Sequence, residues 1–199
     1  MLFRSDGTLV GFPTPATVPG GRFGDSLAYP SSGAYVNIPT LALDTSSGGV
    51  NSISLWYYRA QNVSIDDVLV LMPNSPRYAL WLTQPTGQTG LFLCINTASS
   101  DCFGVQDSTL HDRWVHVVAM FWNGPTVQSS LYIDGQDRNP SCQSSGFSAC
   151  TMKRTVASPV VFGGESSFYF QGWLDEVRVY NRALKASEVT SLYEGTACP

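Results

Sequence analysis

The chain has 199 residues, of which 43% are hydrophobic and 13% are charged, and its net charge is −4. This apolar, weakly charged composition excludes a disordered chain, and the length suits a single domain over residues 1–199. Nucleic-acid binding is excluded because Lys and Arg form no basic stripe, and no apolar run reaches the roughly 18 residues of a membrane span.

Short runs rich in β-branched and aromatic residues follow one another along the chain, separated by prolines and glycines. The strands that these runs predict are 34–38, 52–58, 67–72, 78–83, 90–96, 114–122, 130–133, 160–163 and 172–180. The run WVHVVAMFW at 114–122 is almost continuously apolar, which indicates a strand covered on both faces. Asp134 and Gly135 follow the strand 130–133 and predict a tight hairpin, because both positions of its turn need positive φ.

One helix is expected near the end of the chain. Leu184, Val189, Leu192 and Tyr193 recur at helical spacing, and Gly195 suits a left-handed C-cap. Many short strands without alternating helices predict an all-β fold. We therefore expect an antiparallel two-sheet β-sandwich, or jelly roll, with one short C-terminal helix.

Four of the five cysteines form two pairs with equal spacing. Seven residues separate Cys94 from Cys102, and seven separate Cys142 from Cys150. Both intervening segments are polar and turn-rich, which favours two local disulfides over a zinc site. Two disulfides indicate an oxidising compartment, so we expect a secreted, extracellular or cell-surface protein. Cys198 is left over for a missing flank, a partner domain or chain, or a free thiol.

Four segments, in order, resemble the laminin-G-like family of concanavalin-A-like jelly rolls. They are 21–27 with 33–39, 53–58, 114–118 with 131–135, and 172–184. The last, GWLDEVRVYNRAL, is the most specific match. The resemblance implies a lectin-like module of carbohydrate binding or cell adhesion, and in many members a structural Ca²⁺. Here it suggests Asp6 and Asp175 as calcium ligands, completed by backbone carbonyls, because calcium takes about six to eight oxygens.

Asp175 lies within the predicted strand 172–180. Alternation along that strand places Val177 and Val179 on the same face as Asp175 and Arg178 on the other. A carboxylate at the end of an apolar stripe needs a partner. The alternatives are a backbone N–H, Arg178 across the sheet edge, or a metal ion.

Aromatic residues make up 12% of the chain, and aromatic faces match the C–H patches of sugar rings. Trp56, Trp114 and Trp173 are expected to pack in the core. Three consecutive aromatic residues at 168–170 cannot all point inward, so at least one should contact something outside the core. The candidate ligand-binding residues are Tyr58, Tyr78, Trp81, Trp122 and Tyr169.

Hydrolysis is a further alternative, because glycosidases and lyases share this fold. A glycosidase needs two carboxylates facing one cleft, whereas the adjacent Asp175 and Glu176 point to opposite faces of a strand. His116 is expected to hydrogen-bond within the sheet, and no nucleophile elbow appears. The sequence thus favours a non-catalytic module that binds a glycan or an extracellular protein. A structural or adhesive block of an extracellular assembly is the main alternative, and a polysaccharide-degrading enzyme is third.

Overall fold

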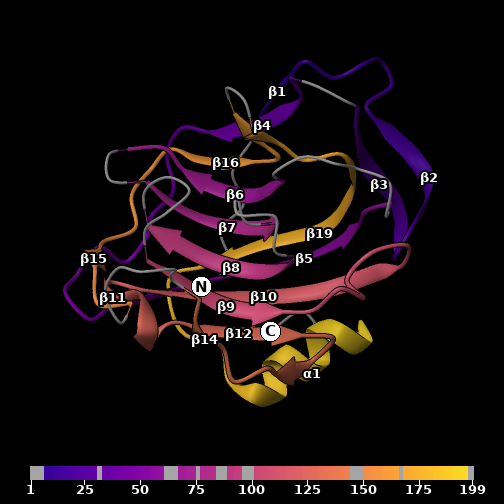
Figure 1. The fold of residues 1–199 in the computed structure, drawn as a ribbon. Helices are drawn as coiled ribbons and strands as arrows, with labels where there is room; N and C mark the ends of the chain where they lie inside the picture. The colour runs from indigo at the N-terminus through magenta and orange to yellow at the C-terminus, as the bar shows by residue number, and fades with distance from the viewer. Residues whose placement is uncertain are drawn as a thin grey trace.

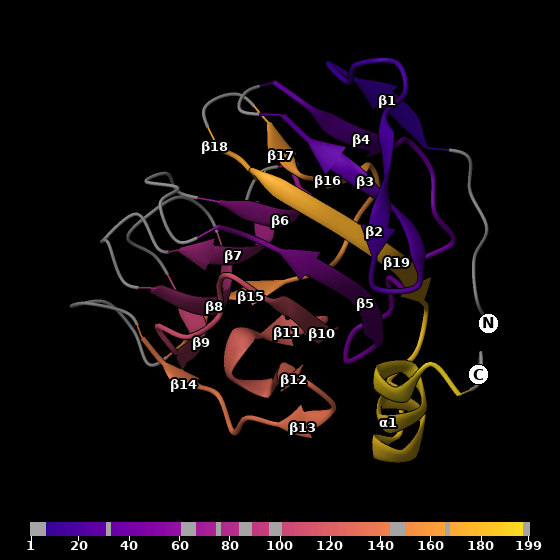
Figure 2. The ribbon, with the colours of Figure 1, turned by 90° about the vertical axis from the view of Figure 1, so that its right-hand side faces the viewer.

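A computed structural model describes residues 7–30, 33–60, 67–74, 77–83, 89–95, 101–143, 150–165 and 168–196. Two large antiparallel sheets lie face to face and enclose the core, as the sequence predicts (Figures 1 and 2). The first sheet has the strand order β1-β4-β16-β6-β7-β8-β9-β14. Its strands are Thr8–Val10 (β1), Tyr35–Ile38 (β4), Val160–Phe162 (β16), Val68–Met72 (β6), Tyr78–Thr83 (β7), Thr89–Ile95 (β8), Cys102–Gln106 (β9) and Ser141–Cys142 (β14).

The second sheet has the strand order β13-β12-β10-β5-β19-β3-β2. Its strands are Gln136–Asp137 (β13), Ser130–Ile133 (β12), Trp114–Trp122 (β10), Val50–Tyr58 (β5), Gly172–Tyr180 (β19), Gly24–Tyr29 (β3) and Thr17–Gly21 (β2). Two small ribbons complete the strands. They pair Gly124–Pro125 (β11) with Lys153–Arg154 (β15), and Gly164–Glu165 (β17) with Phe168–Tyr169 (β18).

The core forms where alternate side chains of the two sheets meet. Leu55 and Tyr57 of β5 point into it beside Val117 and Phe121 of β10, and all four are fully buried. Burying a side chain of this size stabilises the fold by about 1.5–3 kcal/mol. The Tyr57 hydroxyl, which has no water to bond there, donates instead to the carbonyl oxygen of Leu110 at 3.0 Å. A core built this way fixes the register of the strands that carry the surface residues.

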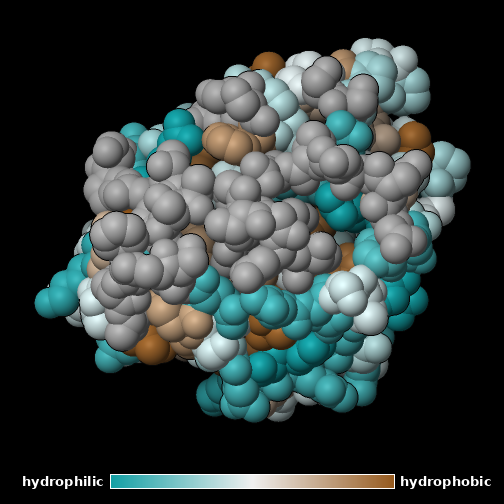
Figure 3. All heavy atoms as spheres, in the orientation of Figure 1, coloured by the Kyte–Doolittle hydropathy of each residue, from teal (hydrophilic) through white to brown (hydrophobic). Residues whose placement is uncertain are grey.

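The helix Ala186–Glu194 (α1) covers part of the outer face of the second sheet (Figure 2). Val118 of β10 is buried under it, so the strand predicted to be covered on both faces is indeed covered on both. The helix ends at Gly195 with φ 68°, the predicted left-handed C-cap. Hydrophilic side chains gather on the lower part of the molecule, where α1 lies (Figure 3). Within the described residues no helix is long and apolar enough to cross a membrane.

Both predicted disulfides are confirmed. Cys94–Cys102 links neighbouring positions on β8 and β9, and Cys142–Cys150 begins on β14, which pairs with β9. The N–H of Gln143 donates to the carbonyl oxygen of Cys102 at 2.8 Å, so the two bridges lie side by side. Cys198 lies outside the described residues.

Strand β19 contains a β-bulge that the simple alternation missed. Its pairing with β5 shifts between Asp175 and Arg178, and Glu176 adopts φ 52°. The extra residue moves Asp175 and Arg178 to the same outer face, since they pair with outward-pointing positions of β5. Val177 is 38% exposed, while Val179 faces the core. The prediction that Asp175 shares a face with both valines was therefore wrong.

Candidate functional site

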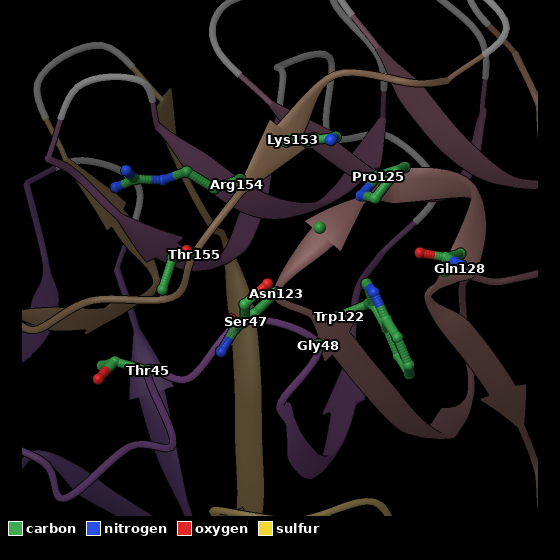
Figure 4. Close-up of a pocket in the computed structure, with 11 residues that line it drawn as sticks. Thr45, Ser47, Gly48, Trp122, Asn123, Pro125, Gln128, Lys153, Arg154 and Thr155 are labelled. Carbon is green, nitrogen blue, oxygen red and sulfur yellow. The ribbon is translucent and has the colours of Figure 1, made fainter.

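Three chain segments meet at the end of β10 and enclose a pocket of about 440 Å³, which we call the rim pocket (Figure 4). They are the loop before β5, the stretch from the end of β10 into the 3-10 helix Thr126–Gln128 (η1), and β15 with its following residue. The pocket lies near β11 and β15, at the left of Figure 1. Its lining residues are Thr45, Ser47, Gly48, Trp122, Asn123, Gly124, Pro125, Gln128, Lys153, Arg154 and Thr155.

Asn123 holds the three segments of the rim pocket together. Its side-chain amide nitrogen donates to the carbonyl oxygens of Asp44 at 2.6 Å and Ser46 at 3.0 Å. Its side-chain oxygen accepts the N–H of Val156 at 2.9 Å. Asn123 is also 4% exposed, so both ends of its amide are committed to the protein. This residue therefore shapes the pocket, and other side chains must supply the contacts to a ligand.

Trp122 contributes the aromatic surface of the rim pocket. A Cβ at Gly124 would lie 2.8 Å from two atoms of the indole, and one at Gly48 would lie 3.8 Å from its far edge. The Trp122 backbone N–H donates to Ser129 Oγ at 3.2 Å, which anchors the residue at the end of β10. Gly124 thus packs closely against one edge of a half-buried ring, and Gly48 lies near its far edge. Figure 4 shows Trp122 among the other lining residues.

The rim pocket carries two positive charges and no carboxylate among its lining residues. Lys153 is exposed, whereas Arg154 is half-buried and donates to the carbonyl oxygen of Asn74 at 2.9 Å. Burial lowers the pKa of Arg154, whose guanidinium nevertheless stays charged at neutral pH. Sequence reasoning did not select either cation, because their proximity to Trp122 depends on the pairing of β11 with β15.

The second disulfide braces the strand that carries these cations. The carbonyl oxygen of Cys150 accepts both the Val127 N–H at 3.1 Å and the Thr126 hydroxyl at 3.1 Å. Two residues later, the N–H of Met152 donates to the carboxylate of Asp101. The bridge to Cys142 therefore helps to fix β15 against η1, on the opposite side of the pocket from the loop before β5.

A second surface, which we call the aromatic groove, has a volume of about 450 Å³ and is lined by Val18, Pro19, Gly20, Ser26, Tyr58, Trp114 and Trp173. Tyr58 pairs in register with both tryptophans, and its ring lies 6.0 Å from Trp114 and 5.2 Å from Trp173. Trp173 is 36% exposed and Trp114 is half-buried, so the expectation that they pack in the core was wrong. Both lie on the outer face of the second sheet because that is where Tyr58 points.

The five predicted ligand-binding residues do not form one site. Trp122 lines the rim pocket and Tyr58 lines the aromatic groove. Tyr78 is fully buried and bonds Ser129 Oγ at 2.8 Å, so in this structure it has no surface for a ligand. Trp81 is 2% exposed on the first sheet, where its ring packs 5.0 Å from that of Phe168. Tyr169, on β18, is half-buried and lines neither surface.

The carboxylate of Asp175 accepts hydrogen bonds from backbone N–H groups. One carboxylate oxygen accepts the N–H of Phe23 at 3.0 Å, and the other accepts the N–H of Glu176 at 2.8 Å. Among the residues that the structure describes, no three His, Cys, Asp or Glu side chains group as a metal site would require. Asp6 lies outside that part of the chain. The described residues alone therefore do not fit a calcium ion, and calcium stays a prediction of the family resemblance.

Ser54 and His116 lie close enough together to be considered as a catalytic pair. Ser54 Oγ is 3.0 Å from His116 Nε2, and Asp134 accepts the backbone N–H of His116 at 3.0 Å. In a catalytic triad the carboxylate orients the imidazole ring, which Asp134 does not do here. Ser54 and His116 are also buried, out of reach of a substrate. The pair is a structural hydrogen bond within the sheet, as predicted for His116.

Comparison with known proteins identifies the fold family. A family model described as the concanavalin A-like lectin/glucanases superfamily matches residues 30–190. Domain 4 of AbnA, a GH43 extracellular arabinanase from Geobacillus stearothermophilus solved in complex with arabinotriose, is similar in structure. It shows 18% identity and a TM-score of 0.61, covering 94% of this chain and 87% of that one. No curated protein sequence matches this chain.

Receptor-binding domains of botulinum neurotoxins are also similar in structure. That of serotype D shows 16% identity and a TM-score of 0.63, covering 96% of this chain and 48% of that one. The serotype G binding domain shows 13% identity and a TM-score of 0.56, covering 94% and 46%. This chain therefore spans about half of each toxin domain, and at these identities the likeness establishes the fold alone.

Proposed function

Because the chain belongs to the concanavalin A-like lectin/glucanase superfamily, we propose that it is a non-catalytic extracellular module that binds a glycan in the rim pocket. The observation that carries this proposal is the placement of the Trp122 indole in an open pocket whose lining also includes hydroxyl, amide and cationic side chains. A sugar ring presents C–H groups on its faces and hydroxyls around its edge. It therefore needs an aromatic surface with hydrogen-bonding groups beside it.

The lining residues of the rim pocket supply both requirements. The half-buried indole of Trp122 lines the pocket. Gln128 lies on the same side as the indole in Figure 4, while Ser47 and Thr155 line other walls. An amide and two hydroxyls provide donors and acceptors for sugar hydroxyls. Few polar groups around an apolar surface are the usual composition of a small-molecule site.

Two further findings support the proposal. The intrachain disulfides favour an oxidising compartment, where glycans of cell surfaces and matrices are found. A fold neighbour from an arabinanase was solved with arabinotriose bound, so a chain of this architecture does hold a sugar. Among the described residues, neither the rim pocket nor the aromatic groove is lined by a carboxylate. A glycosidase needs two such groups.

A glycan array probed with the purified chain tests the proposal. Trp122→Ala should weaken binding at least about tenfold, equivalent to about 1.4 kcal/mol. Trp173→Ala is the matched control, because it removes an indole from the aromatic groove and leaves the rim pocket unchanged. If only the control variant loses binding, the glycan site is the aromatic groove rather than the rim pocket. Binding to no glycan would overturn the proposal.

The aromatic groove favours a second candidate function, a structural or adhesive contact with another protein. Tyr58, Trp114 and Trp173 form a largely apolar surface beside Pro19, and exposed aromatic clusters are typical of protein interfaces. Sedimentation of the wild-type chain over a range of concentrations tests it. Self-association that Trp173→Ala abolishes would support the structural alternative. A monomer at all concentrations would leave this surface without a self-partner.

A further inference from the structure

We propose that the rim pocket selects saccharides that carry a negative charge, either a uronic-acid carboxylate or a sulfate. This inference rests on the proposed function, since it names the class of glycan that the same pocket takes. It starts from the pairing of β11 with β15, which places Lys153 opposite Pro125 and Arg154 opposite Gly124. Gly124 packs against the Trp122 indole, since a Cβ there would lie 2.8 Å from two indole atoms, so β11 and its partner β15 lie close to that ring.

The two cations are not neutralised by the protein. Neither Lys153 nor Arg154 forms an ion pair within the part of the chain that the structure describes. The Nε of Arg154 is buried and has no hydrogen-bond partner among those residues. A buried donor without a partner costs free energy that an incoming acceptor recovers. Arg154 in particular is therefore prepared for an anion, because its guanidinium binds carboxylates and sulfates through several donors at once.

The carboxylates near the pocket are engaged elsewhere. Asp44 precedes the pocket loop, but its Oδ1 accepts the N–H and the hydroxyl of Ser46, at 2.9 and 2.5 Å. Asp101 accepts the N–H of Met152, on the side of β15 that leads back to the disulfide. Neither lines the pocket, so a bound anion meets two positive charges and no negative one there. The net charge of −4 includes Lys153 and Arg154, so the other residues sum to −6, and their field is screened over about 8 Å at physiological salt.

Matched pairs of ligands separate charge from shape. Trigalacturonate and its methyl ester differ only at the carboxylates, and a heparin tetrasaccharide and its desulfated form differ mainly at the sulfates. We expect at least one acidic member to bind about tenfold more tightly than its neutralised partner, and that preference to shrink as salt is raised. The pair that shows the preference identifies whether carboxylate or sulfate is the recognised group.

Charge variants test whether β15 is responsible. Lys153→Gln with Arg154→Gln should remove the preference, so that the acidic and the neutral member bind with similar affinity. Lys185→Gln is the control for one lost positive charge, because Lys185 is exposed before α1 and outside the pocket. Arg154→Lys keeps the charge and should retain part of the preference. Far-ultraviolet circular dichroism of each variant establishes that the fold is kept.

The outcomes distinguish the two proposals. If neutral and acidic partners bind equally, the charge selection is wrong and the glycan-binding function stands. If the preference persists in the double glutamine variant, the anionic group binds at another surface and the inference fails. If neither these saccharides nor any glycan of the array binds, both proposals fail together.

Discussion

Lowering the pH from 7 to 5 should destabilise the fold by about 2 kcal/mol through one buried histidine. His116 is fully buried, with its ring 5.1 Å from that of Trp56 and 6.0 Å from that of Tyr193. Burial lowers the pKa of His116 from 6.5 to about 4; Asp134 opposes the shift and Arg178 adds to it. The folded protein therefore keeps this ring neutral at a pH where the unfolded chain protonates it.

The sign and size of the effect follow from this difference in pKa. Between pH 6.5 and about 4 the unfolded state binds a proton that the folded state does not, so stability falls as the pH falls. The difference between a pKa of 6.5 and one of about 4 corresponds to about 3 kcal/mol when complete. About 2 kcal/mol of it should be lost by pH 5. Glu188, whose pKa is lowered to about 2 by Arg182, contributes mainly at lower pH.

Urea denaturation followed by tryptophan fluorescence, at constant ionic strength and at several pH values between 7 and 5, measures this loss. In His116→Gln the pH dependence within that window should largely disappear, although the variant is less stable throughout. His111→Gln, which changes the other histidine of the chain, should retain it. A flat wild-type profile, or an equal slope in His116→Gln, would refute the assignment to this ring.

Three further predictions concern the supports of the fold. Arg59→Ala should lower the free energy of unfolding, measured by urea denaturation, by about 3–5 kcal/mol, because it removes the ion pair of Arg59 with the buried Asp67. If Arg59→Lys, which keeps the charge, destabilises the protein as much as Arg59→Ala, lost packing rather than lost charge would be the cause. Replacing Cys142 and Cys150 by serine should lower the free energy of unfolding by about 2.5 kcal/mol, because the short loop that the disulfide closes gains freedom in the unfolded chain. The same replacement should weaken glycan binding, although neither residue lines the rim pocket. Because the described residues alone do not fit a calcium ion, we expect equal melting temperatures with calcium and with EDTA. A rise with calcium that Asp175→Asn removes would instead support the ion that the family resemblance predicts.

Local sequence patterns predicted the fold because each signal lies within one element. Alternation in β5 and the apolar run of β10 gave strands with nearly the observed bounds, and Asp134-Gly135 gave the turn, with φ 52° and 77°. Strand β9, which contains a glycine, was not among the predicted strands. That residue, Gly104, lies where a Cβ would meet the carbonyl oxygen of Leu91 at 2.1 Å, so close approach of β8 requires it.

The surface sites were harder to predict, because they depend on which strands become neighbours. Trp114 and Trp173 look like core residues within their own strands, and only their common pairing with Tyr58 places them outside. The alternation of polar and apolar residues does not reveal the bulge after Asp175, because the extra residue in β19 reverses which positions point outward. Trp122 was predicted as a binding residue, but nothing in its own strand indicates that Lys153 lines the same pocket.

The two surfaces respond differently to changes in sequence. The aromatic groove depends on the register of three strands, so a change that alters its shape also disturbs the second sheet. Of the residues of the two large sheets, the rim pocket takes only Trp122. Asn123 and the second disulfide hold the segments that form its other walls. Its lining side chains, such as Gln128 and Lys153, can then change the ligand chemistry at little cost to the core. This separation explains how an acidic chain carries a local positive site, and why overall charge does not reveal what the pocket binds.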